Sequence, residues 1–184
     1  MIQPAIGLLE TNSIAKGIEA SDAMCKMSGI QLVDAYPICP GKYIILITGL
    51  LADVQSSINR GEEIASNTVI DKFIIPNVHK QVIPAILGTN EIKLFEAVGI
   101  IETFTVASCI RAADAAAKAA KIELIEIRLA KGLGGKSFVT LCSDDVGAVR
   151  SAVNAGCEII KDEGVIINRV VIPKAHQELR RTLL

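Results

Sequence analysis

The sequence predicts an α+β protein made of two similar domains. Each half of the chain follows the order strand, helix, strand, strand, helix, strand, and the first half recurs in the second. At an offset of 92 residues, 12 of the 28 positions in 5–32 are identical to those in 97–124. A period this long exceeds the ~20–50 residues of a solenoid repeat and indicates a duplicated domain. We place the domains at residues 1–90 and 91–184.

The first elements follow from the apolar pattern and its punctuation. Residues 5–10 form an apolar run typical of a buried strand, and Thr, Asn and Ser at 11–13 are good helix caps. A helix is predicted for 14–28, where apolar residues recur at helical spacing until Gly29 ends it.

The rest of the first domain contains three strands and two helices. The predictions are strands at 30–38, 42–48 and 69–75, a helix at 51–65, and a short helix at 78–87. Two prolines and a glycine within 37–41 place a loop between the first two of these strands. The second domain repeats the order, with a longer second helix at 144–160. Each domain should therefore be a mainly antiparallel four-stranded sheet with flanking helices, the arrangement called ferredoxin-like.

Composition excludes several function classes. The net charge is −1 and no basic stripe with interleaved aromatic residues is visible, so nucleic acid is not an expected partner. No apolar run reaches the ~18 residues that a membrane helix needs. Hydrophobic residues nevertheless make up 51% of the chain and the mean hydropathy is +0.45, which predicts apolar surface buried between subunits.

The five cysteines occur singly, without paired spacing, at 25, 39, 109, 142 and 157. No secretory signal precedes the first strand. Both observations favour a reduced, cytoplasmic location over a disulfide framework.

Several short motifs now resemble the bacterial microcompartment shell domain. They are GLLET at 7–11, ASDAMCK at 20–26 and IPNVH at 75–79, then GIIET at 99–103, AADAAAK at 112–118, KGLGGK at 131–136 and IPKAH at 172–176. The sequence ICPGK at 38–42 narrows the resemblance to the tandem-domain, trimeric iron–sulfur shell proteins of propanediol-utilisation-type microcompartments.

That resemblance implies a structural protein without enzymatic activity. It implies a flat homotrimer that mimics a six-domain hexagonal tile and meets other shell proteins edge to edge. The residues matching the loops that ring the central pore are Ile38, Pro40, Gly41, Lys42, Lys131, Gly132, Leu133, Gly134, Gly135 and Lys136. Those placed at the tile edge are Lys26, Lys118, Asn77, His79, Lys174 and His176. Hexameric relatives usually carry arginine where this chain has Asn77 and Lys174, so the edge contacts are expected to differ.

Cys39 distinguishes the two pore loops, because the second loop has glycines and no cysteine. A Cys-Pro pair in a tight loop suits an iron–sulfur ligand, but common clusters use about four ligands. A three-fold axis would bring three Cys39 thiolates together. With the resemblance, this predicts one [4Fe–4S] cluster per trimer, with one iron lacking a cysteine, and electron transfer across the shell to a redox enzyme inside. Delivery of the cluster to other proteins and redox gating of the pore are alternatives to electron transfer. The simplest alternative to a cluster ligand is that Cys39 is an ordinary loop residue.

Two rival functions stay open. One is a cluster-free tile with a metabolite pore, and the other is a regulatory trimer of ferredoxin-like domains that binds a small molecule. Glu10 and Glu102 are expected to hydrogen-bond at the junction of strand and helix. Asp22 and Asp114 precede Lys26 and Lys118 by four residues, the spacing of a helical ion pair. The two histidines are assigned to packing or subunit contacts.

Overall fold

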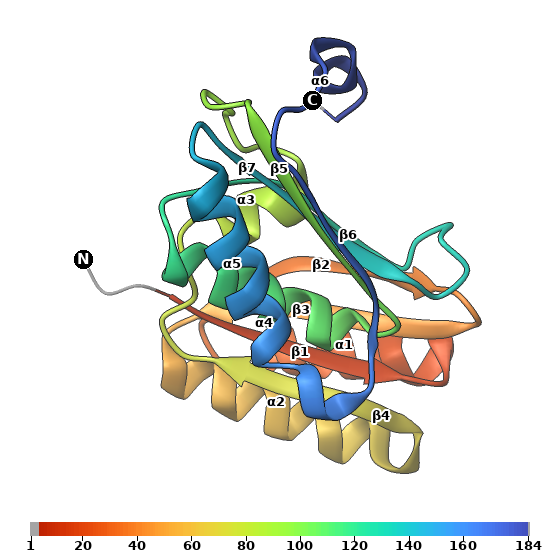
Figure 1. The fold of residues 1–184 in the computed structure, drawn as a ribbon. Coiled ribbons are helices and arrows are strands. Elements are labelled where there is room, and N and C mark those ends of the chain that lie inside the picture. Colours follow the sequence, from red (N-terminus) through yellow and green to blue (C-terminus); the bar gives the residue numbers. More distant parts are fainter. Residues whose placement is uncertain (1–3, 184) are drawn as a thin grey trace. The chain divides into compact units, whose positions relative to one another are not determined.

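Each half of the chain builds one four-stranded antiparallel sheet, in a computed structural model that describes residues 4–183 (Figure 1). The first unit contains β1 (Ala5–Thr11), α1 (Ile14–Met27), β2 (Gln31–Ile38), β3 (Lys42–Gly49), α2 (Leu51–Ala65) and β4 (Val69–Ile75). The second contains α3 (Val82–Leu87), β5 (Ala97–Thr103), α4 (Val106–Ala119), β6 (Glu123–Leu129), β7 (Ser137–Ser143), α5 (Val146–Glu158), β8 (Ile166–Ile172) and α6 (Gln177–Leu183). One-turn 3₁₀ helices precede β4 and β8, at Ser66–Thr68 and Lys161–Glu163.

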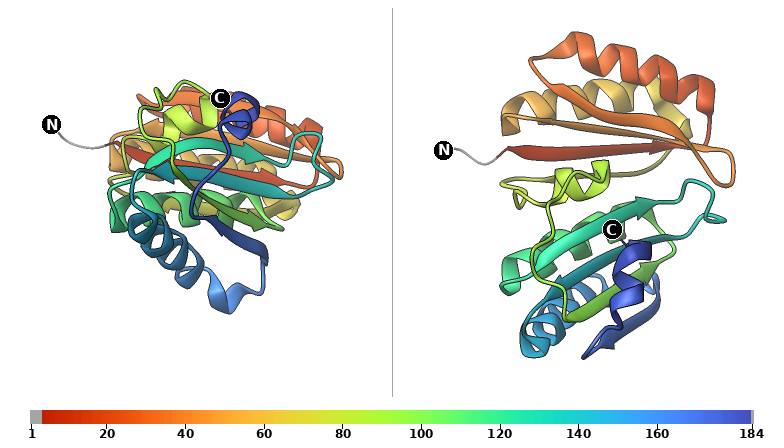
Figure 2. Two further views of the ribbon diagram at one scale, coloured as in Figure 1. Left: turned by 45° about the horizontal axis from the view of Figure 1, so that its top comes forward. Right: turned by 90° about the horizontal axis from the view of Figure 1, so that it is seen from above.

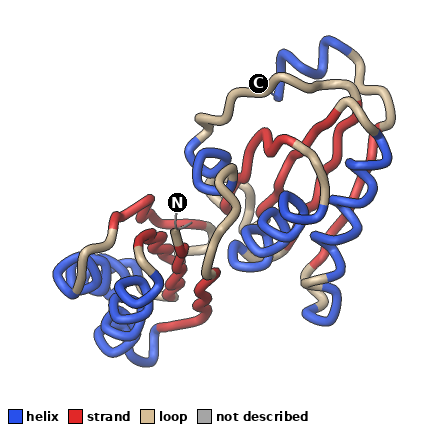
Figure 3. Tube along the Cα trace, turned by 90° about the vertical axis from the view of Figure 1, so that its left-hand side faces the viewer, coloured by secondary structure: helices blue, strands red, loops and turns tan. Residues whose placement is uncertain are grey.

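The two sheets have the same strand order. It is β2-β3-β1-β4 in the first unit and β6-β7-β5-β8 in the second, so the first strand of each domain is central. Figure 2 shows α1 and α2 on one face of the first sheet, and α4 and α5 on one face of the second. In Figure 3 the strands of each unit lie together, with helices beside them. The predicted ferredoxin-like α+β fold is therefore confirmed in both domains.

A glycine in each central strand explains how the second helix lies so close to the sheet. A Cβ atom on Gly7 would lie 2.8 Å from Cγ1 of Val54, and one on Gly99 would lie 2.7 Å from Cγ2 of Val153. Neither distance is compatible with ordinary carbon contact, so any larger residue would push the helix away. This packing requirement accounts for one of the identities between the two copies.

Most predicted boundaries agree with the structure to within two residues, with differences at the prolines. Pro37 falls in both the predicted strand at 30–38 and the predicted loop at 37–41, and it lies inside β2. An edge strand tolerates proline because one row of its N–H groups has no strand partner. The short helix α3 begins at Val82 instead of residue 78, and Pro84 lies in its first turn, where no helical N–H partner is needed.

The two units divide after Val78. Residues 79–90, which the sequence analysis places with the first domain, are therefore grouped with the second.

Candidate functional site

Cys39 lies at the tip of the turn between β2 and β3. Ile38 and Lys42 face each other as the last pair of the two strands, which leaves a three-residue connection. Gly41 has φ of +78°, the left-handed conformation that such a hairpin loop needs at one position. Ile38 is buried, Cys39 is half-buried, and Pro40 is exposed. The local sequence thus projects one thiol at the end of a strand hairpin.

The remaining cysteines lie in different environments. Cys109, Cys142 and Cys157 are buried, whereas Cys25 is exposed on α1. Burial raises the pKa of both Cys109 and Cys142 to about 12 and also raises the pKa of Cys157. Because the thiolate is the form that binds metals, these three are poor ligands at neutral pH.

A single chain does not assemble a metal centre at Cys39. Within residues 4–183, no group of three or more His, Cys, Asp or Glu side chains is placed to hold a metal ion. A cluster bound here would need ligands from further copies of the chain.

Lys42 forms an ion pair with a buried carboxylate. Its Nζ lies 2.8 Å from Oε1 of Glu10, whose side chain is only 3% exposed. Glu10 faces Ile44 in the sheet, so Lys42 is its diagonal neighbour on the adjacent strand. Glu10 was expected to form a hydrogen bond at the end of its strand, and Lys42 is the partner that the sequence did not reveal.

The same pair recurs in the second unit. Lys136 Nζ lies 3.3 Å from Oε1 of Glu102, and this carboxylate is 31% exposed. Between β6 and β7, Gly132, Gly134 and Gly135 all have positive φ, and Lys136 N–H donates to the Leu133 carbonyl at 3.2 Å. The second predicted pore loop therefore occupies the same place in its domain as the first, without a thiol.

The predicted edge residues fall into two differently packed sets. Lys26 Nζ lies 2.6 Å from Asp22, and Lys118 Nζ lies 2.6 Å from Asp114. Asp22 is 62% exposed, but Asp114 is 9% exposed and also accepts from the His79 backbone N–H at 2.8 Å. The structure thus brings Lys118 and His79 together through Asp114. Both predicted helical ion pairs are present.

The other predicted edge residues follow the ends of β4 and β8. Asn77 and Lys174 are exposed, and Asn77 has φ of +55°. His79 and His176 each accept a backbone N–H two residues later at Nδ1, at 3.4 and 3.2 Å. Burial lowers the pKa of His79 below its usual 6.5, against an opposing effect of Asp114.

Two residues with backbone contacts were not singled out by the sequence. Gln81 and Asn90 bond to the edge strand β6, and neither lies in a recognisable motif.

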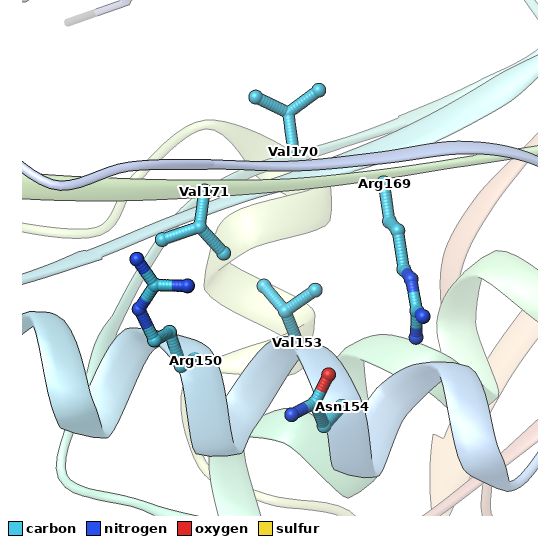
Figure 4. A pocket seen from close by; sticks show the side chains of 6 residues that line it. All are labelled: Arg150, Val153, Asn154, Arg169, Val170 and Val171. Carbon is cyan, nitrogen blue, oxygen red and sulfur yellow. The ribbon is translucent and has the colours of Figure 1, made fainter.

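A shallow cavity lies between α5 and β8 (Figure 4). Its volume is about 260 Å³, and Arg150 and Arg169 extend into the gap between helix and strand while Val170 points away. A cavity of about 240 Å³ occupies the same place between α2 and β4. Both are smaller than the ~300–1,000 Å³ of typical ligand pockets. Their duplication makes them a feature of the fold, which does not favour the small-molecule regulator.

The duplicated βαββαβ unit defines the class: a tandem-domain α+β protein with matching loops in both copies. The BMC domain family matches residues 5–78 and 97–175. The chain belongs to this family and is a bacterial microcompartment shell protein with two BMC domains.

Individual relatives agree with this assignment. The chain is 41% identical over 180 residues to the bacterial microcompartment shell protein PduT of Citrobacter freundii, covering 98% of this chain and 97% of the relative. A crystal structure of a microcompartments protein from Desulfitobacterium hafniense DCB matches at 51% identity with a TM-score of 0.93, covering 97% and 99% of the two chains. The shell protein EutM of Salmonella typhimurium is 34% identical over 84 residues, covering 46% of this chain and 84% of EutM.

Membership of the BMC domain family confirms the predicted resemblance to the microcompartment shell domain. It also confirms the predicted location in the shell and the structural, non-catalytic role. None of the helices within residues 4–183 is long and apolar enough to cross a bilayer.

Proposed function

We propose that three copies of the chain form one pseudo-hexagonal shell tile whose pore loops bind a [4Fe–4S] cluster, and that the tile carries electrons across the shell. The observation that carries this proposal is the position of Cys39, a half-buried thiol at the tip of the β2–β3 turn. The equivalent turn of the second unit has no cysteine.

The residues present fit such a group in donor chemistry and accessibility. One chain supplies one thiolate, and a closed three-fold ring supplies three around a common axis. Common clusters use about four protein ligands, so one iron would lack a cysteine and take water or a small ligand. Cys39 is the ligand in this proposal, and it shares its three-residue turn with Pro40 and Gly41.

Lys42 contributes less positive charge to this site than its position in the sequence indicates. Its ammonium group is paired with Glu10, so the pair as a whole is neutral. The Lys42–Glu10 pair instead ties the start of β3 to the central strand β1 and thereby fixes one end of the turn that carries Cys39. The bound cluster would supply one-electron chemistry.

The remaining predicted residues have architectural roles in this proposal. Lys131 and Lys136 with the glycines between them complete the ring of pore loops, and Lys26 and Lys118 lie at the boundary with neighbouring tiles. Other shell proteins are the expected edge partners, and a redox enzyme inside the shell is the expected electron partner.

The test is iron and sulfide analysis with electron paramagnetic resonance of anaerobically purified trimer, oxidised and then reduced. Four irons shared by three chains give about 1.3 iron per chain. Cys39→Ser should lose the iron and the signal. Cys25→Ser is the matched control, because Cys25 is also accessible, and it should retain both.

The outcomes separate the rival functions. Intact trimers that lack iron, or a signal that persists in Cys39→Ser, overturn the cluster and favour the metabolite pore. Iron that moves to an iron-free acceptor protein on mixing favours cluster delivery over electron transfer. Trimers that never assemble into sheets or shells contradict the tile.

A further inference from the structure

The segment that follows the first domain covers the outer edge of the second sheet. Gln81 Oε1 accepts the Leu124 N–H at 2.7 Å, and Gln81 Nε2 donates to the Ile122 carbonyl at 3.3 Å. Asn90 Nδ2 donates to the Leu124 carbonyl at 2.8 Å. These bonds satisfy backbone groups of β6 that an edge strand otherwise leaves open.

The same segment, which includes helix α3, also contacts helix α4. Helix α3 packs along β6, and its residues Val82 and Ala85 are buried. The His79 N–H donates to Asp114 on α4. Residues 79–90 therefore act as a strap that joins the edge strand β6 to helix α4.

The equivalent edge of the first unit, strand β2, is more exposed. Leu32 pairs with Ile47 on the neighbouring strand, and Leu124 pairs with Leu141 at the equivalent position of the second unit. Leu32 is 45% exposed, whereas Leu124 is fully buried. The carboxylates differ in the same direction, because Asp22 is 62% exposed and Asp114 only 9%.

The end of the chain has the form of a second strap. Val78 N–H donates to the Pro4 carbonyl at 3.0 Å, and Ala175 N–H donates to the equivalent Glu96 carbonyl at 2.7 Å. The chain therefore leaves β4 and β8 in the same way, and the two following histidines make the same Nδ1 contact. Helix α6 has no fully buried residue, whereas α3 has two. Leu179 and Leu183 of α6 are partly buried against the cluster around Phe95 in their own unit.

We propose that residues 173–183 of one chain dock on α1 and β2 of a second copy. In this contact the His176 N–H donates to Asp22 of the partner subunit, as His79 does to Asp114 within one chain. Glu178, at the position of Gln81, accepts from the open edge of β2, and α6 covers the exposed Leu32. The contact is head-to-tail, so it generates a ring when its rotation closes. It rests on the proposed trimer and names the surfaces that hold it together.

A disulfide cross-link tests the contact directly. Asp22→Cys and His176→Cys are combined in a Cys25→Ser background, and the protein is oxidised and run on a denaturing, non-reducing gel. A covalent trimer is expected. The matched control carries His79→Cys and Asp114→Cys, which should close within one chain and run as a monomer. Asp22→Cys alone should give no trimer, which excludes cross-links through the native cysteines.

Sedimentation equilibrium on single variants gives an independent measurement. Asp22→Asn should weaken association roughly tenfold, as expected for one charge-assisted hydrogen bond lost from an interface. Asp114→Asn should lower the thermal midpoint and leave association unchanged. Two results together overturn the docking: Asp22→Asn trimers of normal affinity, and no covalent trimer from the Asp22→Cys, His176→Cys variant. These results would leave the tile and its cluster intact. Parent protein that is monomeric overturns the trimer itself.

Discussion

Lys42 Nζ lies 2.8 Å from Oε1 of Glu10, and this ion pair joins the residue after the Cys39 turn to a carboxylate that is almost fully buried. The equivalent pair in the second unit, between Lys136 and Glu102, is longer and more exposed. A buried acceptor that loses its partner costs more free energy than an exposed one, so the two pairs should differ in their contribution to stability.

Replacing Glu10 by Gln should lower the free energy of unfolding by about 1 kcal/mol, discounted because Lys42 is partly exposed. The matched change Glu102→Gln should cost at most about 0.5 kcal/mol. Thermal midpoints measured at one protein concentration, in iron-free protein, compare the two. Equal shifts would contradict the difference in burial.

Cysteine accessibility gives a second prediction. In iron-free native protein, a thiol reagent at neutral pH should modify at most two cysteines per chain, Cys25 and Cys39. Cys109, Cys142 and Cys157 are buried with raised pKa values, so they should react only after unfolding. Mass spectrometry of modified peptides identifies the sites. Rapid labelling of any of these three would show that the fold opens more readily than its packing indicates.

His79 should make the protein less stable at mildly acidic pH. Its pKa is lower in the folded state than the usual 6.5, so the unfolded chain binds more protons once the pH falls below that value. The thermal midpoint should therefore fall between about pH 7.5 and about pH 5.5. His79→Gln should reduce this dependence.

The control for His79 is His176→Gln, because that side chain is exposed. If His79→Gln left the pH dependence of the thermal midpoint unchanged, other titrating groups would be its cause.

Substitution of both edge lysines should separate tile formation from tile assembly. Lys26→Ala with Lys118→Ala should abolish extended sheets while trimers persist, because both ammonium groups are accessible. Electron microscopy and size-exclusion chromatography measure the two properties. Lys16→Ala with Lys161→Ala, which changes two other exposed lysines, should still form sheets. If the variant with Lys26→Ala and Lys118→Ala still formed sheets, these lysines would not mediate contacts at the tile edge.

The order of elements could be read from local patterns. Apolar runs, helical spacing and capping residues depend on neighbours in the sequence, and the cap predicted before the first helix is formed by Ser13, whose side chain accepts from Lys16 N–H. Pro37 was placed in both a strand and a loop, because an isolated proline does not reveal that its strand lies at an edge of the sheet.

By itself, the sequence determined that one domain is present twice and that Cys39 belongs to only one copy. These facts need only the identity and order of residues. Only the tertiary structure decided which equivalent residues differ in burial, such as Asp22 and Asp114. It also decided that Glu10 forms an ion pair with Lys42. Burial and cross-strand pairing depend on what packs against each side chain, and segments far apart in the chain supply those neighbours.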